Sequence, residues 1–223
     1  MTSIRTKTIT ALALALAATA AGAHAQATGT SDFTPEKAGE WVVAARITAV
    51  DPAEKGNIVT AAGASTGLHV GVDNDTIPSL GFSYFFTDHI AAEAILGTSQ
   101  HTISAVGASS STDVYKTWVL PPVVTLQYHF APDQRVSPYL GVGVNFMDWY
   151  SGKDEKGFTV KLKNGGGTAI QGGVNVALKG HWALNFDVKK VFYATDAKID
   201  GGALKSHVKL DPTIASLGLA YRF

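Results

Sequence analysis

Residues 213–223 read Thr-Ile-Ala-Ser-Leu-Gly-Leu-Ala-Tyr-Arg-Phe and alternate with a period of two. One face of this segment is small or polar, and the other is apolar and carries Leu217, Leu219, Tyr221 and Phe223. Such a strand suits a wall between lipid and the lumen of a barrel. Bacterial outer-membrane barrels end on an aromatic residue that the barrel-assembly machinery reads, so Tyr221 and Phe223 are a candidate assembly signal. A final strand of a soluble sandwich is the alternative for this segment alone.

The first 25 residues have the features of a secretory signal. Basic Arg5 and Lys7 precede an apolar run over residues 9–21, and Ala23-His24-Ala25 is a small-x-small cleavage site. We expect a cleaved signal peptide over residues 1–25 and a single barrel over residues 26–223. No stretch reaches the roughly 18 apolar residues of a membrane-spanning helix, so a mature chain in a membrane must form a closed barrel.

The composition excludes several kinds of partner and cofactor. The chain has 18 basic and 18 acidic residues, and removal of Arg5 and Lys7 leaves 16 against 18, a formal charge of −2. That balance argues against a nucleic-acid partner, because phosphate binding needs a basic excess. The chain has no Cys, so disulfides and thiolate metal sites are excluded.

Eight segments alternate with the period of a strand. They are residues 41–50, 77–86, 90–97, 123–130, 139–146, 168–178, 182–189 and 213–223. Short turns near Asp88, Asp133 and Gly180 alternate with long connections over residues 51–76, 98–118, 147–167 and 193–209. The pattern predicts an all-β fold, an eight-stranded antiparallel transmembrane β-barrel of the outer membrane with periplasmic turns and termini and long extracellular loops. An aromatic girdle is expected at the periplasmic end, formed by Trp41, Phe86, Phe130, Trp182 and Phe223.

Several short segments, in order along the chain, resemble the OmpW family of small outer-membrane proteins. They are Trp41 with Arg46 and Asp51-Pro52, Leu120-Pro121-Pro122 with residues 125–130, residues 138–146, Asp211-Pro212, and residues 218–223. The resemblance covers essentially the whole mature chain. It implies an eight-stranded barrel with a narrow, largely apolar channel, which small hydrophobic molecules enter from outside and leave sideways into the outer membrane.

Charged side chains are expected inside the barrel. The inward set contains Arg46, Glu93, Asp187, Lys189 and Arg222. An eight-stranded interior is just wide enough for its own side chains, and an unpaired charge there costs several kcal/mol. We therefore hypothesise a salt-bridged plug in the lower or middle part of the lumen, which closes the route to the periplasm. A purely structural network is the alternative and is compatible with a plug. Lys189 departs from the bulky apolar residue that similar proteins carry near this position.

Cargo above a closed floor must use the upper half of the lumen and the wall. The inward apolar or aromatic candidates for lining this path are Val42, Phe85, Ile95 and Tyr139, each of which could also be packing filler. Pro121 and Pro122 cannot donate ladder hydrogen bonds, so they are candidates for a lateral opening, or simply mark the start of a strand. The loops offer a possible apolar funnel, made of Leu68, Val70, Val72, Tyr115 and Trp118.

Neither catalysis nor metal binding is indicated. The six His residues of the mature chain have no spacing that marks a triad or a metal site, so no enzyme, cofactor or metal is predicted. The predicted function is passive uptake of small apolar molecules through the outer membrane. The predicted partners of the protein are these molecules and the lipid of that membrane. The alternatives are a non-transporting surface protein, serving in stress response or as a phage or bacteriocin receptor, and a lipid-modifying enzyme.

Overall fold

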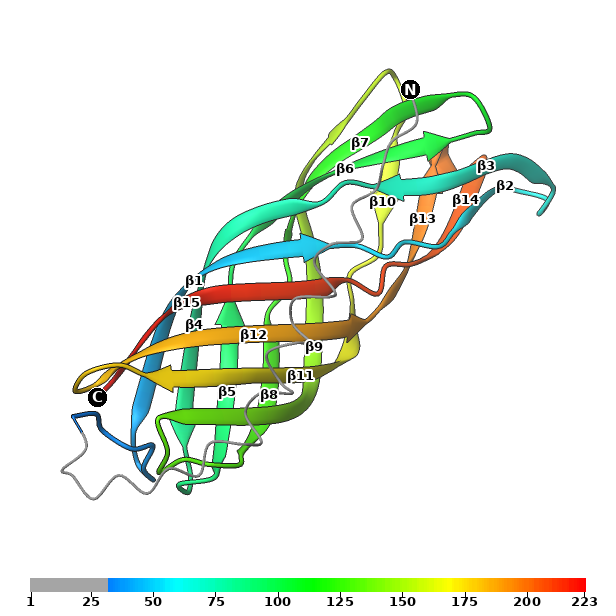
Figure 1. Cartoon of the computed structure of the whole chain (residues 1–223). Helices are drawn as coiled ribbons and strands as arrows, with labels where there is room; N and C mark the ends of the chain where they lie inside the picture. Colours follow the sequence, from blue (N-terminus) through cyan, green and yellow to red (C-terminus); the bar gives the residue numbers. More distant parts are fainter. Residues whose placement is uncertain (1–31) are drawn as a thin grey trace.

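The computed structural model describes residues 32–223, and the predicted signal peptide lies outside them. Eight strands close into an antiparallel barrel (Figure 1). They are β1 (Trp41–Asp51), β4 (Asp75–Phe85), β5 (Ile90–Leu96), β8 (Val123–His129), β9 (Val136–Asp154), β11 (Gly165–Ala177), β12 (Trp182–Phe192) and β15 (Thr213–Arg222). The pairing of β8 with β9 completes the ring. The predicted fold class is confirmed.

The long connections are folded as strands, although their sequences gave no clear periodicity. Their strands are β2 (Asn57–Thr60), β3 (Ser65–Val72), β6 (Ser99–Val106), β7 (Ser111–Leu120), β10 (Val160–Leu162), β13 (Ala194–Ile199) and β14 (Leu204–Lys209). Together with the outer part of β9 they form a second sheet that prolongs the barrel at one end (Figure 1). We call this sheet the extension and its side of the barrel the loop end. The opposite side, with the three short turns, is the turn end, which faces the periplasm in outer-membrane barrels.

Side chains alternate strictly between lumen and outer surface. Along β8, Thr125, Gln127 and His129 are buried, whereas the intervening Leu126 and Tyr128 are about half exposed. The same alternation in the other barrel strands surrounds the barrel with an apolar band suited to lipid. Among the described residues, no helix is both long and apolar enough to span a membrane.

Aromatic rings gather on the outer surface at the turn end. Trp182 and Phe223 both pack against Tyr221, with ring centroids 4.9 Å apart in each pair. Tyr84 makes similar contacts with Trp41 and Phe86. The terminal residue is anchored as well, because the Phe223 amide donates to the Trp41 carbonyl at 2.9 Å.

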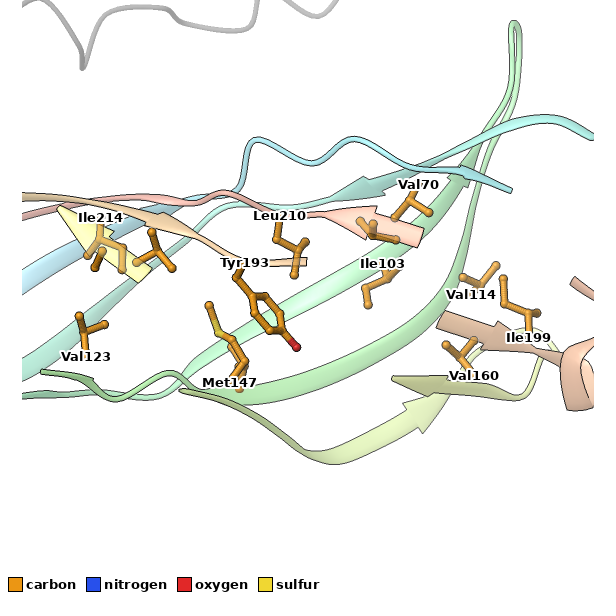
Figure 2. Close-up of a cluster of buried hydrophobic side chains, with 14 of the residues drawn as sticks. Val70, Ile103, Val114, Val123, Met147, Val160, Tyr193, Ile199, Leu210 and Ile214 are labelled. Atoms are coloured by element: carbon orange, nitrogen blue, oxygen red, sulfur yellow. The ribbon is translucent and has the colours of Figure 1, made fainter. Parts of the chain in front are cut away.

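The buried apolar side chains form two separate clusters. A small one at the turn end consists of Val42, Ala44, Phe85, Ala91, Ala183 and Ala220. A larger one runs from the loop-end half of the barrel into the extension (Figure 2). In Figure 2, Val123 and Ile214 mark its barrel side, Met147 and Tyr193 its middle, and Val160 and Ile199 its outer side. The polar lumen lies between the two clusters.

Candidate functional site

Four charged side chains meet in the middle of the lumen, and we call this group the ionic floor: Arg46, Glu93, Asp187 and Lys189. The Arg46 guanidinium lies 2.5 Å from the Glu93 carboxylate, and both side chains are almost fully buried. The Lys189 ammonium lies 3.2 Å from Glu93 and 2.5 Å from Asp187, also without exposure to solvent. Two cations thus neutralise two anions in one cross-section, as burial of charge requires.

Uncharged polar groups add further hydrogen bonds to the ionic floor. The Gln171 amide donates to Glu93 at 2.6 Å and to Asp187 at 2.5 Å, and the Gln127 amide donates to Glu93 at 2.8 Å. The Tyr139 hydroxyl donates to Asp187 at 2.8 Å. Glycine makes the room for this network: a Cβ added at Gly81 would lie 2.6 Å from the Arg46 guanidinium.

Arg222 was predicted in the same plug, but the structure places it in a separate turn-end group. Its guanidinium lies 3.6 Å from Glu36, whose carboxylate also accepts hydrogen bonds from Ser137 at 2.7 Å and Asn175 at 2.8 Å. His129 Nδ1 is 2.9 Å from the same carboxylate. Burial acts to raise the pKa of Glu36, but the hydrogen bonds of His129, Ser137 and Asn175 and the charge of His129 together outweigh it and hold that pKa below its ordinary value.

Glu36 is the charged lumen residue that the sequence did not reveal. It belongs to residues 32–40, which precede β1 and fold back into the turn end, where the Glu36 amide donates to the Pro132 carbonyl. Only 1% of Glu36 is exposed. Since the segment has no strand periodicity, no sequence pattern marked its side chain as inward.

The four predicted lining residues are all buried, but they lie at different levels. Val42 and Phe85 belong to the turn-end apolar cluster, and the Phe85 ring packs 4.8 Å from that of His129. The expectation that they lie in the upper half is wrong, because β1 starts and β4 ends at the turn end. Tyr139 is bonded into the ionic floor, so Ile95 is the candidate that lies among the loop-end aliphatic side chains.

Above the ionic floor the lumen becomes apolar. One layer of hydroxyls comes first, in which Thr48 Oγ1 lies 2.7 Å from Ser79 Oγ and 2.9 Å from Ser216 Oγ. Aliphatic side chains follow continuously into the extension, where Val70 is a buried member of the larger apolar cluster and Leu68, Val72 and Tyr115 pack against that cluster. The fifth predicted funnel residue, Trp118, is instead 37% exposed. A cavity of about 20 Å³ lies among the aliphatic residues of the extension, enough for about one water.

Asn145 is a polar exception in this apolar half. It is 4% exposed, and neither its amide nitrogen nor its amide oxygen has a hydrogen-bond partner. Its ladder neighbours are Val123 and Gly167. An unsatisfied buried amide of this kind lowers stability.

The barrel wall has a break in its hydrogen-bond ladder where barrel and extension meet. The β5–β8 ladder ends at the pair Ile95 and Val123, and the β6–β7 ladder begins at Ser99 and Val119. Between them lie residues 97–98 on one side and Pro121-Pro122 on the other, which we call the wall break. Pro78 of β4 borders it too, since a Cβ added at Gly97 would lie 3.5 Å from the Pro78 carbonyl oxygen. Sequence reasoning found the proline pair but missed Pro78 and residues 97–98.

One hydrogen-bonded set has the residue types of a nucleophile, a base and an acid. His101 Nε2 lies 2.9 Å from Ser99 Oγ, and His101 Nδ1 lies 2.8 Å from the Asp73 carbonyl oxygen. The Asp73 carboxylate is farther, at 3.8 Å. Ser99 has no exposed surface, so its hydroxyl is out of reach of a substrate. We interpret the set as a structural polar contact. No group of three metal-binding side chains occurs within residues 32–223.

Comparisons with known proteins agree with this architecture. The OmpW family model matches residues 37–223. The outer-membrane protein y4mB of Sinorhizobium fredii is 43% identical over 161 residues, 70% of this chain and 70% of that protein. Outer membrane protein W of Salmonella typhimurium is 31% identical over 199 residues, 84% of this chain and 90% of that protein.

A solved structure is similar over the same length. The crystal structure of the outer membrane protein OprG from Pseudomonas aeruginosa aligns with a TM-score of 0.80 at 26% sequence identity, covering 85% of this chain and 98% of that one. The chain therefore belongs to the OmpW family and is an integral β-barrel protein of the bacterial outer membrane.

Proposed function

We propose that the protein is a non-enzymatic conduit for passive uptake of small hydrophobic molecules, which leave it sideways into the outer membrane. The observation that carries this proposal is the division of the lumen. Above the ionic floor, a continuous set of aliphatic side chains runs from the barrel through the extension (Figure 2). A path with such a lining favours apolar cargo over ions and sugars.

The ionic floor supports a sideways exit. Its four charges are paired, and amide and phenol groups donate further hydrogen bonds to Glu93 and Asp187. An apolar molecule cannot replace those contacts, so it would leave buried charges unpaired if it passed between them. The turn-end group around Glu36 and Arg222 is a second barrier below the floor.

The wall break is the proposed exit. Proline offers no N–H to a ladder, and residues 97–98 lie outside the ladders of β5 and β6. On the lumen side, the buried side chains of Ile77, Ile95 and Val123 lie next to it. Opening at this point therefore disrupts fewer hydrogen bonds than opening between fully paired strands. Cargo moves the aliphatic side chains aside, since the cavity among them is smaller than any such molecule.

Uptake of naphthalene by cells tests the conduit. Cells that carry the protein in their outer membrane are compared with cells that lack it and with an Ile95→Trp variant at matched expression. We expect faster uptake with the protein and suppression by the Trp side chain, which fills the lumen beside the wall break. Equal uptake in all three strains contradicts the proposal and favours the non-transporting surface protein.

A disulfide staple tests the exit separately. Ser99 and Val119 are a ladder pair just above the wall break, and Cα atoms of such pairs lie within disulfide range. The chain has no Cys, so Ser99→Cys with Val119→Cys introduces one defined bridge. We expect oxidation to slow uptake and reduction to restore it. The matched control is Ala44→Cys with Ala220→Cys, a buried pair in the continuous β1–β15 ladder at the turn end, away from the proposed path. Oxidation of this control bridge should leave uptake unchanged.

The assembly signal remains part of the proposal. Phe223 is 69% exposed and packs on Tyr221 at the turn end, so both rings are on the outer surface. Replacement of Phe223 by Ala should lower the folded fraction in the outer membrane of cells, with little effect on the stability of barrel refolded in vitro. Equal loss in both assays contradicts a role in recognition by the assembly machinery.

A further inference from the structure

The outer face of the extension carries rows of lysine that lie side by side on neighbouring strands. Lys161 of β10 pairs directly with Lys198 of β13, and Lys198 pairs directly with Lys205 of β14. All three side chains are exposed. Like charges directly opposite one another destabilise a sheet. Three lysines in one row across three strands therefore need an explanation beyond folding.

Two further rows lie between this one and the barrel. In the row nearest the barrel, Lys55 and Lys209 face each other in an antiparallel bridge whose backbone hydrogen bonds measure 2.8 and 2.9 Å. In the middle row, Lys163 follows the end of β10 and its amide donates to the Asp196 carbonyl. These six exposed lysines are the lysine rows: Lys55, Lys161, Lys163, Lys198, Lys205 and Lys209.

Acidic side chains are too few to neutralise the lysine rows. Over residues 32–223, no carboxylate lies within 4.0 Å of the ammonium groups of these six lysines. The one carboxylate within the rows is Asp196, and it already accepts a hydrogen bond from His207 at 2.8 Å. That hydrogen bond, together with the charges of Lys163 and Lys198, holds the pKa of Asp196 below its ordinary value. With six lysines and one carboxylate in the rows, the surface is cationic.

The cationic surface belongs to one side of the extension. It covers β10, β13, β14 and the segment before β2, which are neighbours in the sheet (Figure 1). On the other side, Lys116 of β7 also pairs directly with Lys153 of β9. There, however, the Glu155 carboxylate lies 3.6 Å from the Lys153 ammonium and offsets the repulsion. That side provides an internal comparison with balanced charge.

The height of the lysine rows matches the polar layer of a membrane. The last outward aromatic residue of β12 is Phe192, which is 45% exposed and follows Trp182 by ten residues. At about 3.3 Å per residue and a tilt of about 40°, that span is about 25 Å high, the height of the apolar band of such barrels. Lys209 pairs with Ala194, two residues beyond Phe192, and Lys198 is six residues beyond it. The rows therefore lie about 5 to 15 Å above the hydrocarbon.

We propose that the lysine rows bind the phosphate groups of the glycolipid in the outer leaflet of the outer membrane. Phosphates on a lipid anchored beside the barrel reach this height and supply the missing anions. Lysine is a compact cation that binds phosphate as a point charge, and clusters of lysine near a membrane surface attract anionic headgroups. Bound phosphates also relieve the repulsion between the paired lysines. This inference does not depend on the proposed conduit.

Retention of lipopolysaccharide by the barrel tests the proposal. The full chain is reconstituted in phosphatidylcholine nanodiscs with a small fraction of lipopolysaccharide that carries both lipid A phosphates, then extracted and analysed by native mass spectrometry. We expect bound glycolipid on the wild-type protein, and a loss of at least fivefold in Lys161→Gln/Lys198→Gln/Lys205→Gln. The control Lys116→Gln/Lys153→Gln/Lys156→Gln removes the same charge from the other side of the extension and should retain glycolipid like the wild type.

Three further arms use the wild-type protein, so they do not depend on the folding of a variant. Retention should fall steeply between about 0.05 and 0.5 M salt, where the Debye length shrinks from more than 10 Å to less than 5 Å. Dephosphorylated glycolipid should be retained several-fold less. Inorganic phosphate at millimolar concentration should not displace the lipid, because it lacks the anchor.

Equal retention in both triple variants, equal retention of dephosphorylated lipid, or full displacement by inorganic phosphate would overturn the proposal. The proposal would also be overturned if the lysine-row variant retained glycolipid like the wild type but no longer bound a soluble sulfated polysaccharide.

Discussion

The two halves of the lumen share eight strands but are held together by different forces. Around the ionic floor, each charged group has a fixed partner at hydrogen-bonding distance, and Glu93 alone contacts Arg46, Lys189 and two amides. In the loop-end half, aliphatic side chains meet through contacts that have no preferred direction. The side chains of the ionic floor cannot move apart without leaving charges unpaired. In the apolar half, an apolar molecule can take the place of aliphatic side chains without such a loss. The proposed function rests on this difference, with one barrel shut to ions and open to hydrocarbons.

The largest effect should come from breaking the ionic floor. Glu93→Ala leaves Arg46 and Lys189 buried with one carboxylate between them. We expect the free energy of unfolding to fall by about 3 to 5 kcal/mol. Urea titration of barrel refolded into lipid vesicles measures it. The control is Asp133→Asn in an exposed turn, which should change stability by less than about 0.5 kcal/mol. A loss below about 1 kcal/mol in Glu93→Ala would show that the floor is hydrated or not formed.

In the apolar half, we expect a substitution to lower stability by less and to raise uptake. Ile95→Ala removes buried aliphatic volume next to the wall break, and we expect a loss of about 2 kcal/mol in the free energy of unfolding. The vacated space lies on the proposed path, so naphthalene uptake should rise in the same variant. Urea titration and the cell uptake assay give the two values. Lower uptake at matched expression would contradict the placement of the path.

Much of the ionic floor was predictable from the sequence, whereas little of the loop-end apolar half was. The period of two placed Arg46, Glu93, Asp187 and Lys189 on inward faces of the correct strands, and burial then required them to pair. It could not show that Arg222 pairs with Glu36 instead, because residues 32–40 have no periodicity and their path depends on the assembled barrel. The strands of the extension were missed for a related reason. Their inward side chains pack against one another only after the eight barrel strands bring the connections together.

Asn145 offers a modest test of how dry the apolar half is. Its amide has no hydrogen-bond partner, and leucine has nearly the same shape. Asn145→Leu should therefore raise the free energy of unfolding by about 1 kcal/mol, since it removes an unsatisfied polar group. Urea titration in vesicles measures the change. A loss of about 2 kcal/mol or more would mean that the amide has a partner, such as water in a wetter lumen.

The smallest effect concerns pH at the turn end. The pKa of Glu36 is lowered in the folded protein, so its ionised form stabilises the barrel above the pKa of the unfolded chain. That contribution is lost as the pH falls through the folded-state pKa. The stability difference between wild type and Glu36→Gln should be constant near neutral pH and shrink below the ordinary glutamate pKa of about 4.3. Urea titrations at several pH values follow it, and a difference that grows on acidification would contradict the ion pair.

The division of the lumen is tested most directly by comparing two solutes in one pair of strains. Uptake of naphthalene and of a small hydrophilic sugar is measured in cells with and without the protein, at matched outer-membrane integrity. A barrel closed by the ionic floor and lined above it by aliphatic side chains should speed naphthalene uptake and leave sugar uptake unchanged. Faster sugar uptake would show an open aqueous route through the floor, and no change for either solute would show that the apolar half does not conduct.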